Sequence, residues 1–257
     1  MNPNPDLFPY PLVALQETES TNLYLTRLCR DLQDSVLPFT TVSAEFQTAG
    51  KGQRGNSWEA ESGKNLLFSV VCYPTMLHAR RQFILSQIVS LAIKEELECR
   101  VDEVSIKWPN DIYWRDKKIC GILIENELCG TQIGRSICGI GLNVNQEVFR
   151  SNAPNPVSLK QITGREHNRH ELLLAIVQRI ATAFRQLAGE TGEHYVDGLS
   201  VRYARSLFRR RGYHPYRDAG GVFQARLLRV EADGRLVLED ESGRERTYLF
   251  KEVQYIV

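Results

Sequence analysis

The order of apolar and polar residues along the chain predicts alternating strands and amphipathic helices up to about Gly212. Apolar residues recur at helical spacing over 79–98 and 168–187, so each segment is expected to form a long helix with one face against a sheet. A shorter helix is expected to begin near Thr21. Strands, which are short runs of β-branched and apolar residues, are expected at 12–15, 40–46, 66–73, 104–108, 119–125 and 132–145.

After Gly212 the pattern changes to short alternating runs separated by turns. Strands are expected at 222–230, 235–239 and 246–250, and Asp-Gly and Ser-Gly pairs separate them. This pattern is typical of a small antiparallel barrel. A chain of 257 residues suits one large α/β domain and one small β domain better than two equal halves.

Composition excludes several classes of protein. The net charge is +1, so nothing in the balance of charge calls for nucleic acid or a membrane as partner. The proline-rich start lacks the regions of a signal peptide, and no apolar run is long enough to span a bilayer. The six cysteines are scattered without a C-x-x-C pair, so we expect buried thiols, no metal site and a cytoplasmic protein. A basic cluster at 202–211 lies beside acidic residues and favours a solvated face or an acidic protein partner.

The segment 47–58, QTAGKGQRGNSW, carries three glycines around Lys51 and Arg54. Glycines let a backbone approach a ligand closely, and the two cations suit an anion such as phosphate. A solvated basic turn is an equal alternative on this stretch alone. Trp58 tips the balance, since its flat side chain is placed to close over a planar group such as adenine, although a tryptophan anchoring the next strand remains the alternative.

Three further segments combine polar residues with an ambiguous local role. In S-T-N at 20–22 the side chains either cap the following helix or face a ligand. In the hairpin that begins at Lys107, Asp111 and Lys118 either belong to ordinary turns or face one pocket. In the strand from Gln132, small residues leave room on one face, and the terminal asparagine either meets a purine edge or closes the strand.

Together these segments resemble the biotin protein ligases. The motifs that carry the resemblance are S-T-N at 20–22, the glycine loop at 47–58, K-W-P-N-D at 107–111, K-K-I-C-G-I-L-I-E from 117 and G-I-G-L-N-V-N at 139–145. The similarity runs from about residue 10 to the C-terminus. It implies a catalytic domain related to class II synthetases at 1–208, with a mixed sheet and helices on one side, followed by an SH3-like barrel at 209–257. Only a short lead precedes the motifs, which suggests the ligase-only form without a DNA-binding domain.

The resemblance implies a two-step reaction. Biotin and MgATP give biotinyl-5′-adenylate, and a lysine of a biotin carboxyl carrier protein then attacks it to form an amide and release AMP. By resemblance, Lys118 stabilises developing negative charge and Asp111 orients the incoming lysine. The residues expected around biotin are Ser20, Thr21, Asn22, Gln47, Gly121 and Ile122. The other expected binding residues are the loop residues Gly50, Lys51, Gly52 and Gln53 over the phosphate, Trp58 and Asn143 around adenine, and Lys107 and Asn110.

The glycine loop departs from the family pattern G-R-G-R. Lys51 and Gln53 occupy the two arginine positions, and lysine keeps the charge but loses the bidentate fork. We therefore expect Arg54, together with Lys118, to retain the adenylate. No covalent nucleophile is required, which fits the absence of a Ser-His or Cys-His arrangement in the motifs.

Three alternatives stay open. A lipoate ligase of the same superfamily uses the same chemistry on another acid, although K-W-P-N-D and the barrel favour biotin. A non-catalytic vitamin- or nucleotide-binding protein would not need both Asp111 and Lys118. A DNA-binding repressor would need a recognition helix, which the sequence does not reveal. A homodimer through the exposed strand from Gln132 is left open.

Overall fold

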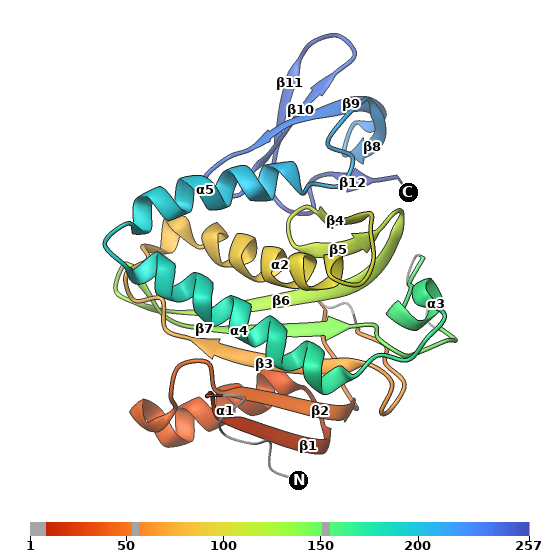
Figure 1. Cartoon of the computed structure of the whole chain (residues 1–257). Helices are drawn as coiled ribbons and strands as arrows, with labels where there is room; N and C mark the ends of the chain where they lie inside the picture. The colour runs from red at the N-terminus through yellow and green to blue at the C-terminus, as the bar shows by residue number, and fades with distance from the viewer. Residues whose placement is uncertain (1–8, 53–56, 151–154, 257) are drawn as a thin grey trace.

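The chain folds around a seven-stranded mixed sheet (Figure 1). The structure is a computed structural model that describes residues 9–52, 57–150 and 155–256. The strand order is β1-β2-β3-β7-β6-β5-β4, with β1 and β2 parallel and the other neighbours antiparallel. This confirms the predicted mixed sheet. Its strands are β1 (Leu12–Thr18), β2 (Thr41–Gln47), β3 (Leu66–Cys72), β4 (Val104–Lys107), β5 (Asp111–Trp114), β6 (Lys117–Cys129) and β7 (Gln132–Leu142).

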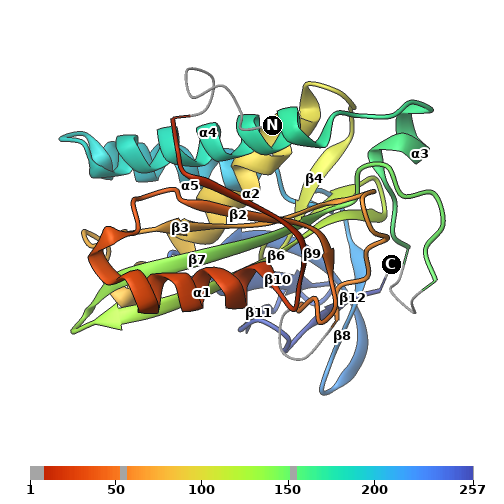
Figure 2. The same cartoon turned by 90° about the horizontal axis from the view of Figure 1, so that it is seen from below.

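Helices lie on both faces of this sheet (Figure 2). One face carries α2 (Phe83–Glu98), α4 (Arg169–Ala188) and α5 (Gly192–Arg205), whereas α1 (Thr21–Leu32) lies alone on the other. Successive side chains of a strand point to opposite faces. In β3, Val70 therefore joins the large core while Val71 packs with α1. The helices do not all lie on one side as expected, because the second face is also apolar and needs a cover.

The two long helices predicted from periodicity are present, the first as a 3₁₀ turn (Ala79–Arg81) followed by α2 and the second as α4. Two helices were not predicted. The connecting segment 157–163 contains α3 (Leu159–Thr163), and α5 follows α4. Only two residues of α5 are buried, so its apolar stripe is too thin to stand out in the sequence. A short 3₁₀ turn at Gln33–Ser35 follows α1.

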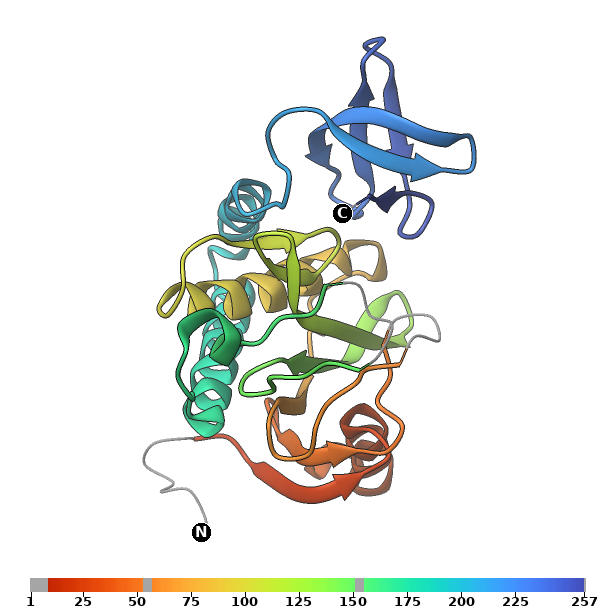
Figure 3. The same ribbon diagram turned by 90° about the vertical axis from the view of Figure 1, so that its right-hand side faces the viewer.

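The C-terminal part forms a second, antiparallel sheet at the β4–β5 end of the first (Figure 3). Its five strands have the order β11-β10-β9-β8-β12. The two sheets are in contact, since the indole Nε1 of Trp108 donates to the carbonyl of Gly234 at 2.8 Å. The predicted β region is confirmed, while closure into an SH3-like barrel and the boundary at 208/209 stay predictions. The strands are β8 (His214–Asp218), β9 (Gly221–Val230), β10 (Leu236–Asp240), β11 (Glu245–Tyr248) and β12 (Gln254–Tyr255).

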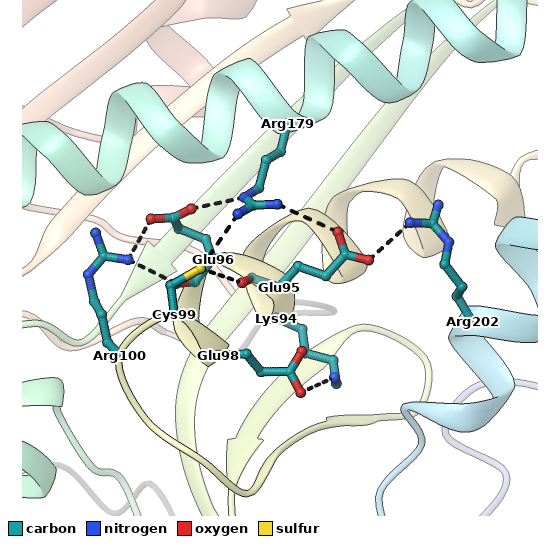
Figure 4. Close-up of polar contacts among 8 residues, drawn as sticks. All are labelled: Lys94, Glu95, Glu96, Glu98, Cys99, Arg100, Arg179 and Arg202. Carbon is teal, nitrogen blue, oxygen red and sulfur yellow. Dashed lines mark hydrogen bonds and ion pairs between the residues drawn. The ribbon is translucent and has the colours of Figure 1, made fainter.

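A cluster of charged side chains connects α2 to α4 and α5 (Figure 4). Glu96, whose side chain is only 7% exposed, accepts from Arg100 at 2.5 Å and from Arg179 Nε at 2.9 Å. Glu95 accepts from Arg202 of α5 at 3.0 Å. These five residues are called the helix cluster below. Each carboxylate meets at least one guanidinium, so the cluster holds the helical layer together without an unpaired buried charge.

Two sequence expectations are wrong in detail. The strand from Gln132 is not an exposed edge, because β7 pairs with β3 on one side and β6 on the other. The edges of the sheet are β1 and β4. Four cysteines are buried, but Cys99 and Cys129 are exposed, so the expectation of burial fails for these two. Among the described residues, no helix has both the length and the apolar character needed to cross a bilayer.

Candidate functional site

The described residues enclose a cavity of about 640 Å³ at one end of the central sheet. It lies between the start of α1, the glycine loop, the β4–β5 hairpin, and the facing ends of β6 and β7. Gly50 lies just outside the lining, and Gln53 and Arg54 fall outside the described residues. The sequence-predicted residues that line the cavity are Ser20, Thr21, Asn22, Gln47, Lys51, Gly52, Trp58, Lys107, Asn110, Asp111, Lys118, Gly121, Ile122 and Asn143.

The start of α1 supplies hydroxyl and amide groups to one end of the cavity. Ser20 is the N-cap residue, but its side chain makes no capping hydrogen bond. The carbonyl oxygen of the Gln47 side chain accepts from the backbone N–H of Thr21 at 2.8 Å and from its hydroxyl at 3.1 Å. Gln47 thus satisfies one of the N–H groups that have no partner within the helix. The capping interpretation of this motif is therefore wrong, and the Ser20 hydroxyl is left to face the cavity.

Two residues that sequence analysis did not identify hold Asn22 in place. Its Nδ2 donates to Glu125 Oε2 at 2.6 Å, and Ser69 Oγ lies 2.6 Å from its Oδ1. A Cβ at Gly139 would lie 2.2 Å from the same Oδ1, so this position has room only for glycine. Both had a signal in the sequence, since Ser69 is the one polar residue of an apolar strand and Glu125 ends the motif K-K-I-C-G-I-L-I-E.

The Trp58 indole lies on the floor of the cavity. A Cβ on Gly121 would be 2.7 Å from the ring, and one on Gly141 would be 2.5 Å from it. These two glycines face each other across β6 and β7, so together they form a flat platform. The backbone N–H of Trp58 donates to Gly50 O at 2.9 Å and fixes the base of the loop. In this arrangement the ring covers Gly121, the predicted biotin wall, and its stacking on adenine stays a prediction.

The β4–β5–β6 hairpins place three charged residues at the other end of the cavity. Lys118 Nζ donates to Asp111 Oδ2 at 2.7 Å, and both side chains are about 70% covered, with 27% and 30% exposed. Lys107 stands opposite Asp111 in the register of β4 and β5. Lys107, Asp111 and Lys118 are called the pocket charges below. The ordinary-turn interpretation fails here, because both members of the pair line the cavity.

Lys107 has a different environment from Lys118. Its Nζ donates to the Tyr113 hydroxyl at 3.0 Å and lies 4.7 Å from the centre of that ring. Burial lowers the pKa of Lys107 to about 8, and the attraction of Asp111 offsets this only in part, while Lys118 and Arg209 lower it further. Burial also raises the pKa of Tyr113, which keeps its hydroxyl protonated.

Asn143 offers an acceptor to the cavity. The residue is 2% exposed, and its Nδ2 donates to Val157 O at 3.2 Å. Its Oδ1 is buried and has no hydrogen-bond partner among the described residues. A buried acceptor without a partner costs free energy unless a ligand satisfies it. This geometry suits the predicted contact with the amino edge of a purine.

The turn between β11 and β12 reaches the cavity through Phe250 and Lys251, which sequence analysis did not identify. The Phe250 ring packs edge-on against Trp108, with 5.9 Å between ring centres. These two aromatic residues are far apart in sequence, and no local pattern signals their contact.

Most of the lining residues come from motifs within the first 143 residues, and residues 16–143 match the sequence profile of the Biotin/lipoate A/B protein ligase family. The chain belongs to this family. This family member is 28% identical over 243 residues to the biotin–[acetyl-CoA-carboxylase] ligase of Paracoccus denitrificans, a match that covers 90% of this chain and 95% of that protein. It is also 26% identical over 215 residues to the bifunctional ligase/repressor BirA of Bacillus spizizenii. That match covers 81% of this chain but only 64% of the longer relative.

Solved structures of the same family share the fold. The biotin protein ligase from Aquifex aeolicus, solved in complex with biotin and ATP, matches this family member with a TM-score of 0.77 at 25% identity. The match covers 96% of this chain and 99% of that chain. Because it includes nearly the whole of both chains, it covers the C-terminal sheet as well as the sheet that carries the cavity.

Proposed function

We propose that this protein is an ATP-dependent biotin ligase, which activates biotin as biotinyl-5′-adenylate and transfers it to a lysine of a biotin carboxyl carrier protein. One observation carries the proposal: a single cavity has a cluster of amide and hydroxyl groups at one end and the Lys118–Asp111 pair at the other. A bicyclic urea with a carboxylate tail matches both ends. Membership of the family and the likeness to ligases named for biotin support this choice.

The polar end of the cavity favours biotin over lipoate. The ureido group of biotin has two N–H donors and a carbonyl acceptor, which match the oxygens and amides of Ser20, Thr21 and Asn22. The dithiolane ring of lipoate offers no such donors, so it would leave buried polar groups without partners. A site built to hydrogen-bond its substrate rejects an analogue that lacks those groups.

In the first step the carboxylate of biotin attacks the α-phosphorus of ATP, and pyrophosphate leaves. Negative charge accumulates around the phosphate, and Lys118 is a cation in the cavity lining that can meet it. To serve there, its ammonium exchanges Asp111 for a phosphate or carboxylate oxygen. Lys51 and Arg54 add charge from the loop in this proposal, and Mg²⁺ enters with the phosphates of ATP, which are its usual ligands in such sites.

In the second step an amine of the carrier attacks the acyl carbon of the adenylate. Once Lys118 has turned to the phosphate, Asp111 is free to bind the ammonium of the carrier lysine and aim it. Trp58 must leave the Gly121–Gly141 platform if biotin lies on that wall, and adenine is the planar group it then meets. Asn143 Oδ1 is placed to accept from the adenine amino group.

The remaining parts of the proposal concern partners and setting. The partner is the biotin-accepting domain of acetyl-CoA carboxylase or a related carboxylase, as the name of the Paracoccus relative suggests. We propose no role for nucleic acid, and a homodimer would have to use a surface other than β7. A cytoplasmic location suits six cysteines that are all unpaired.

ATP–pyrophosphate exchange by the purified protein tests this function. Exchange that depends on biotin, and that neither lipoate nor the absence of an acid supports, is the expected result. Exchange with lipoate alone would transfer the protein to the other branch of its family. No exchange with either acid would overturn the enzymatic proposal and favour a binding protein.

A further inference from the structure

Lys107 is the one pocket charge that has no acidic partner. No ion pair between described residues includes it, whereas Asp111 and Lys118 bind each other at 2.7 Å. Its hydrogen bond goes to the neutral hydroxyl of Tyr113. A half-buried lysine without an ion-pair partner is unusual, because burying an unpaired ammonium is costly. Such an arrangement favours the neutral amine and so creates a base.

The groups that face Lys107 come from three strands and from the segment after α5. From β5, Asp111 favours the ammonium, and from β6, Lys118 opposes it. Arg209, which follows α5, also opposes it, and the Tyr255 ring of β12 lies 5.3 Å from Nζ. Two cations and burial therefore outweigh one carboxylate, with the result that the pKa of Lys107 falls to about 8.

The position of Lys107 matches the route of the carrier lysine. Lys107 and Asp111 are partners across the β4–β5 hairpin and both line the cavity. Asp111 is the group proposed to receive the ammonium of the carrier. An amine held there lies beside Lys107 Nζ, and a carboxylate is a much weaker base than an amine. Asp111 can therefore orient the ammonium without being well suited to deprotonate it.

We propose that Lys107 accepts the proton that the carrier lysine must lose before it attacks, an inference that rests on the proposed function. The carrier ammonium gives one proton to neutral Lys107 and becomes a nucleophilic amine. Its lone pair forms the C–N bond to the acyl carbon. The C–O bond to the phosphate breaks, its electron pair leaves with AMP, and the second N–H proton passes to solvent as the amide forms.

The test separates the two half-reactions in the intact protein. Biotinyl-adenylate is formed on the enzyme, and its transfer to the biotin-accepting domain of an acetyl-CoA carboxylase is followed in a single turnover from pH 6 to 9.5. Wild-type transfer should rise with a midpoint near pH 8. Lys107→Arg keeps a cation but no accessible base, so transfer should fall at least about 100-fold and lose that midpoint. ATP–pyrophosphate exchange should fall far less.

A second variant, at the Tyr113 hydroxyl that binds Lys107, tests whether Lys107 is the proton acceptor. Tyr113→Phe removes the oxygen that accepts from the ammonium, so the pKa of Lys107 falls and the midpoint of transfer should move to lower pH. A purely structural role for Lys107 predicts no such shift. If Lys107→Arg transfers biotin within twofold of the wild-type rate and with the same pH profile, the inference is overturned. Biotin-dependent ATP–pyrophosphate exchange would still support the proposed function in that case. Absence of biotin-dependent exchange in the wild type would instead overturn both.

Discussion

The helix cluster and the pocket charges both consist of ionisable side chains, most of them partly buried, but they differ in how charge is matched. In the helix cluster Glu96 is bound by two arginines, and Glu95 by a third. Among the pocket charges the one carboxylate binds Lys118, and Lys107 is left with a phenol. Matched charges stabilise a fold, whereas an excess of cations leaves a site ready for an anion. The comparison predicts that equivalent mutations act on stability in one region and on chemistry in the other.

The largest expected effect is the loss of Lys118. Lys118→Met removes the cation proposed to meet the phosphate, and adenylate formation should fall about 100- to 1,000-fold, as for the loss of one transition-state donor. Pyrophosphate exchange measures this. Lys117→Met is the matched control, since this neighbour is exposed and does not line the cavity. Equal losses of exchange in the two variants would show that the effect comes from a change in the turn and not from the loss of a cation in the pocket.

The next effect concerns the helix cluster. Glu96→Ala leaves Arg100 without its carboxylate and Arg179 with only the longer contact to Glu95, so the free energy of unfolding should fall by about 3 kcal/mol. The rate of ATP–pyrophosphate exchange per folded molecule should not change. Glu103→Ala breaks an exposed pair with Arg115 and should cost less than about 1 kcal/mol. Urea unfolding compares the two variants, and similar losses would contradict the view that burial makes the cluster important.

A smaller effect is expected from the cavity wall. Gly139→Ala would place a Cβ 2.2 Å from Asn22 Oδ1, so Asn22 must move and the KM for biotin should rise about tenfold, equivalent to about 1.4 kcal/mol. The control is Gly198→Ala in α5, where a Cβ meets no atom within 4 Å. That change should leave KM unaltered and stabilise the helix by about 0.5–1 kcal/mol. An unchanged KM in Gly139→Ala would remove Asn22 from the biotin site.

The smallest effect has the opposite sign from that of Glu96→Ala. In the folded chain the pKa of Lys107 is lowered to about 8, below the ordinary value, so its burial opposes folding most strongly below pH 8. Above pH 8 the unfolded chain binds more protons than the folded one, and stability rises with pH until the ordinary lysine pKa is reached. The lowered pKa corresponds to roughly 3 kcal/mol, but the variant also leaves the Tyr113 hydroxyl without its partner. Lys107→Met should therefore stabilise the protein at pH 7 by a net amount of about 1 kcal/mol. Urea unfolding at pH 7 and 9.5 checks this, and the rise with pH should vanish in the variant.

Local sequence determined most of the elements and most of the residues that line the cavity. The strands and long helices follow from apolar periodicity, which depends on neighbours a few positions apart. The motifs that contain Asn22, Asp111, Lys118 and Asn143 each lie within one short segment, and they identify the family. Each has a bland local explanation, however, and the sequence could not decide between capping or turn chemistry and a shared pocket.

Tertiary structure decided the relations between distant segments. It brought Ser69 and Glu125 to Asn22, placed the Trp58 ring on two glycines from neighbouring strands, and carried Phe250 from the C-terminal sheet to the cavity. It also put β7 inside the sheet, although its sequence is compatible with an edge. Tertiary structure also decided how charges are paired. The contact of Arg179 with Glu96, and the lack of an ion-pair partner at Lys107, depend on which distant segments pack together. Contacts of this kind arise from packing across the fold, and periodicity within a segment carries no information about them.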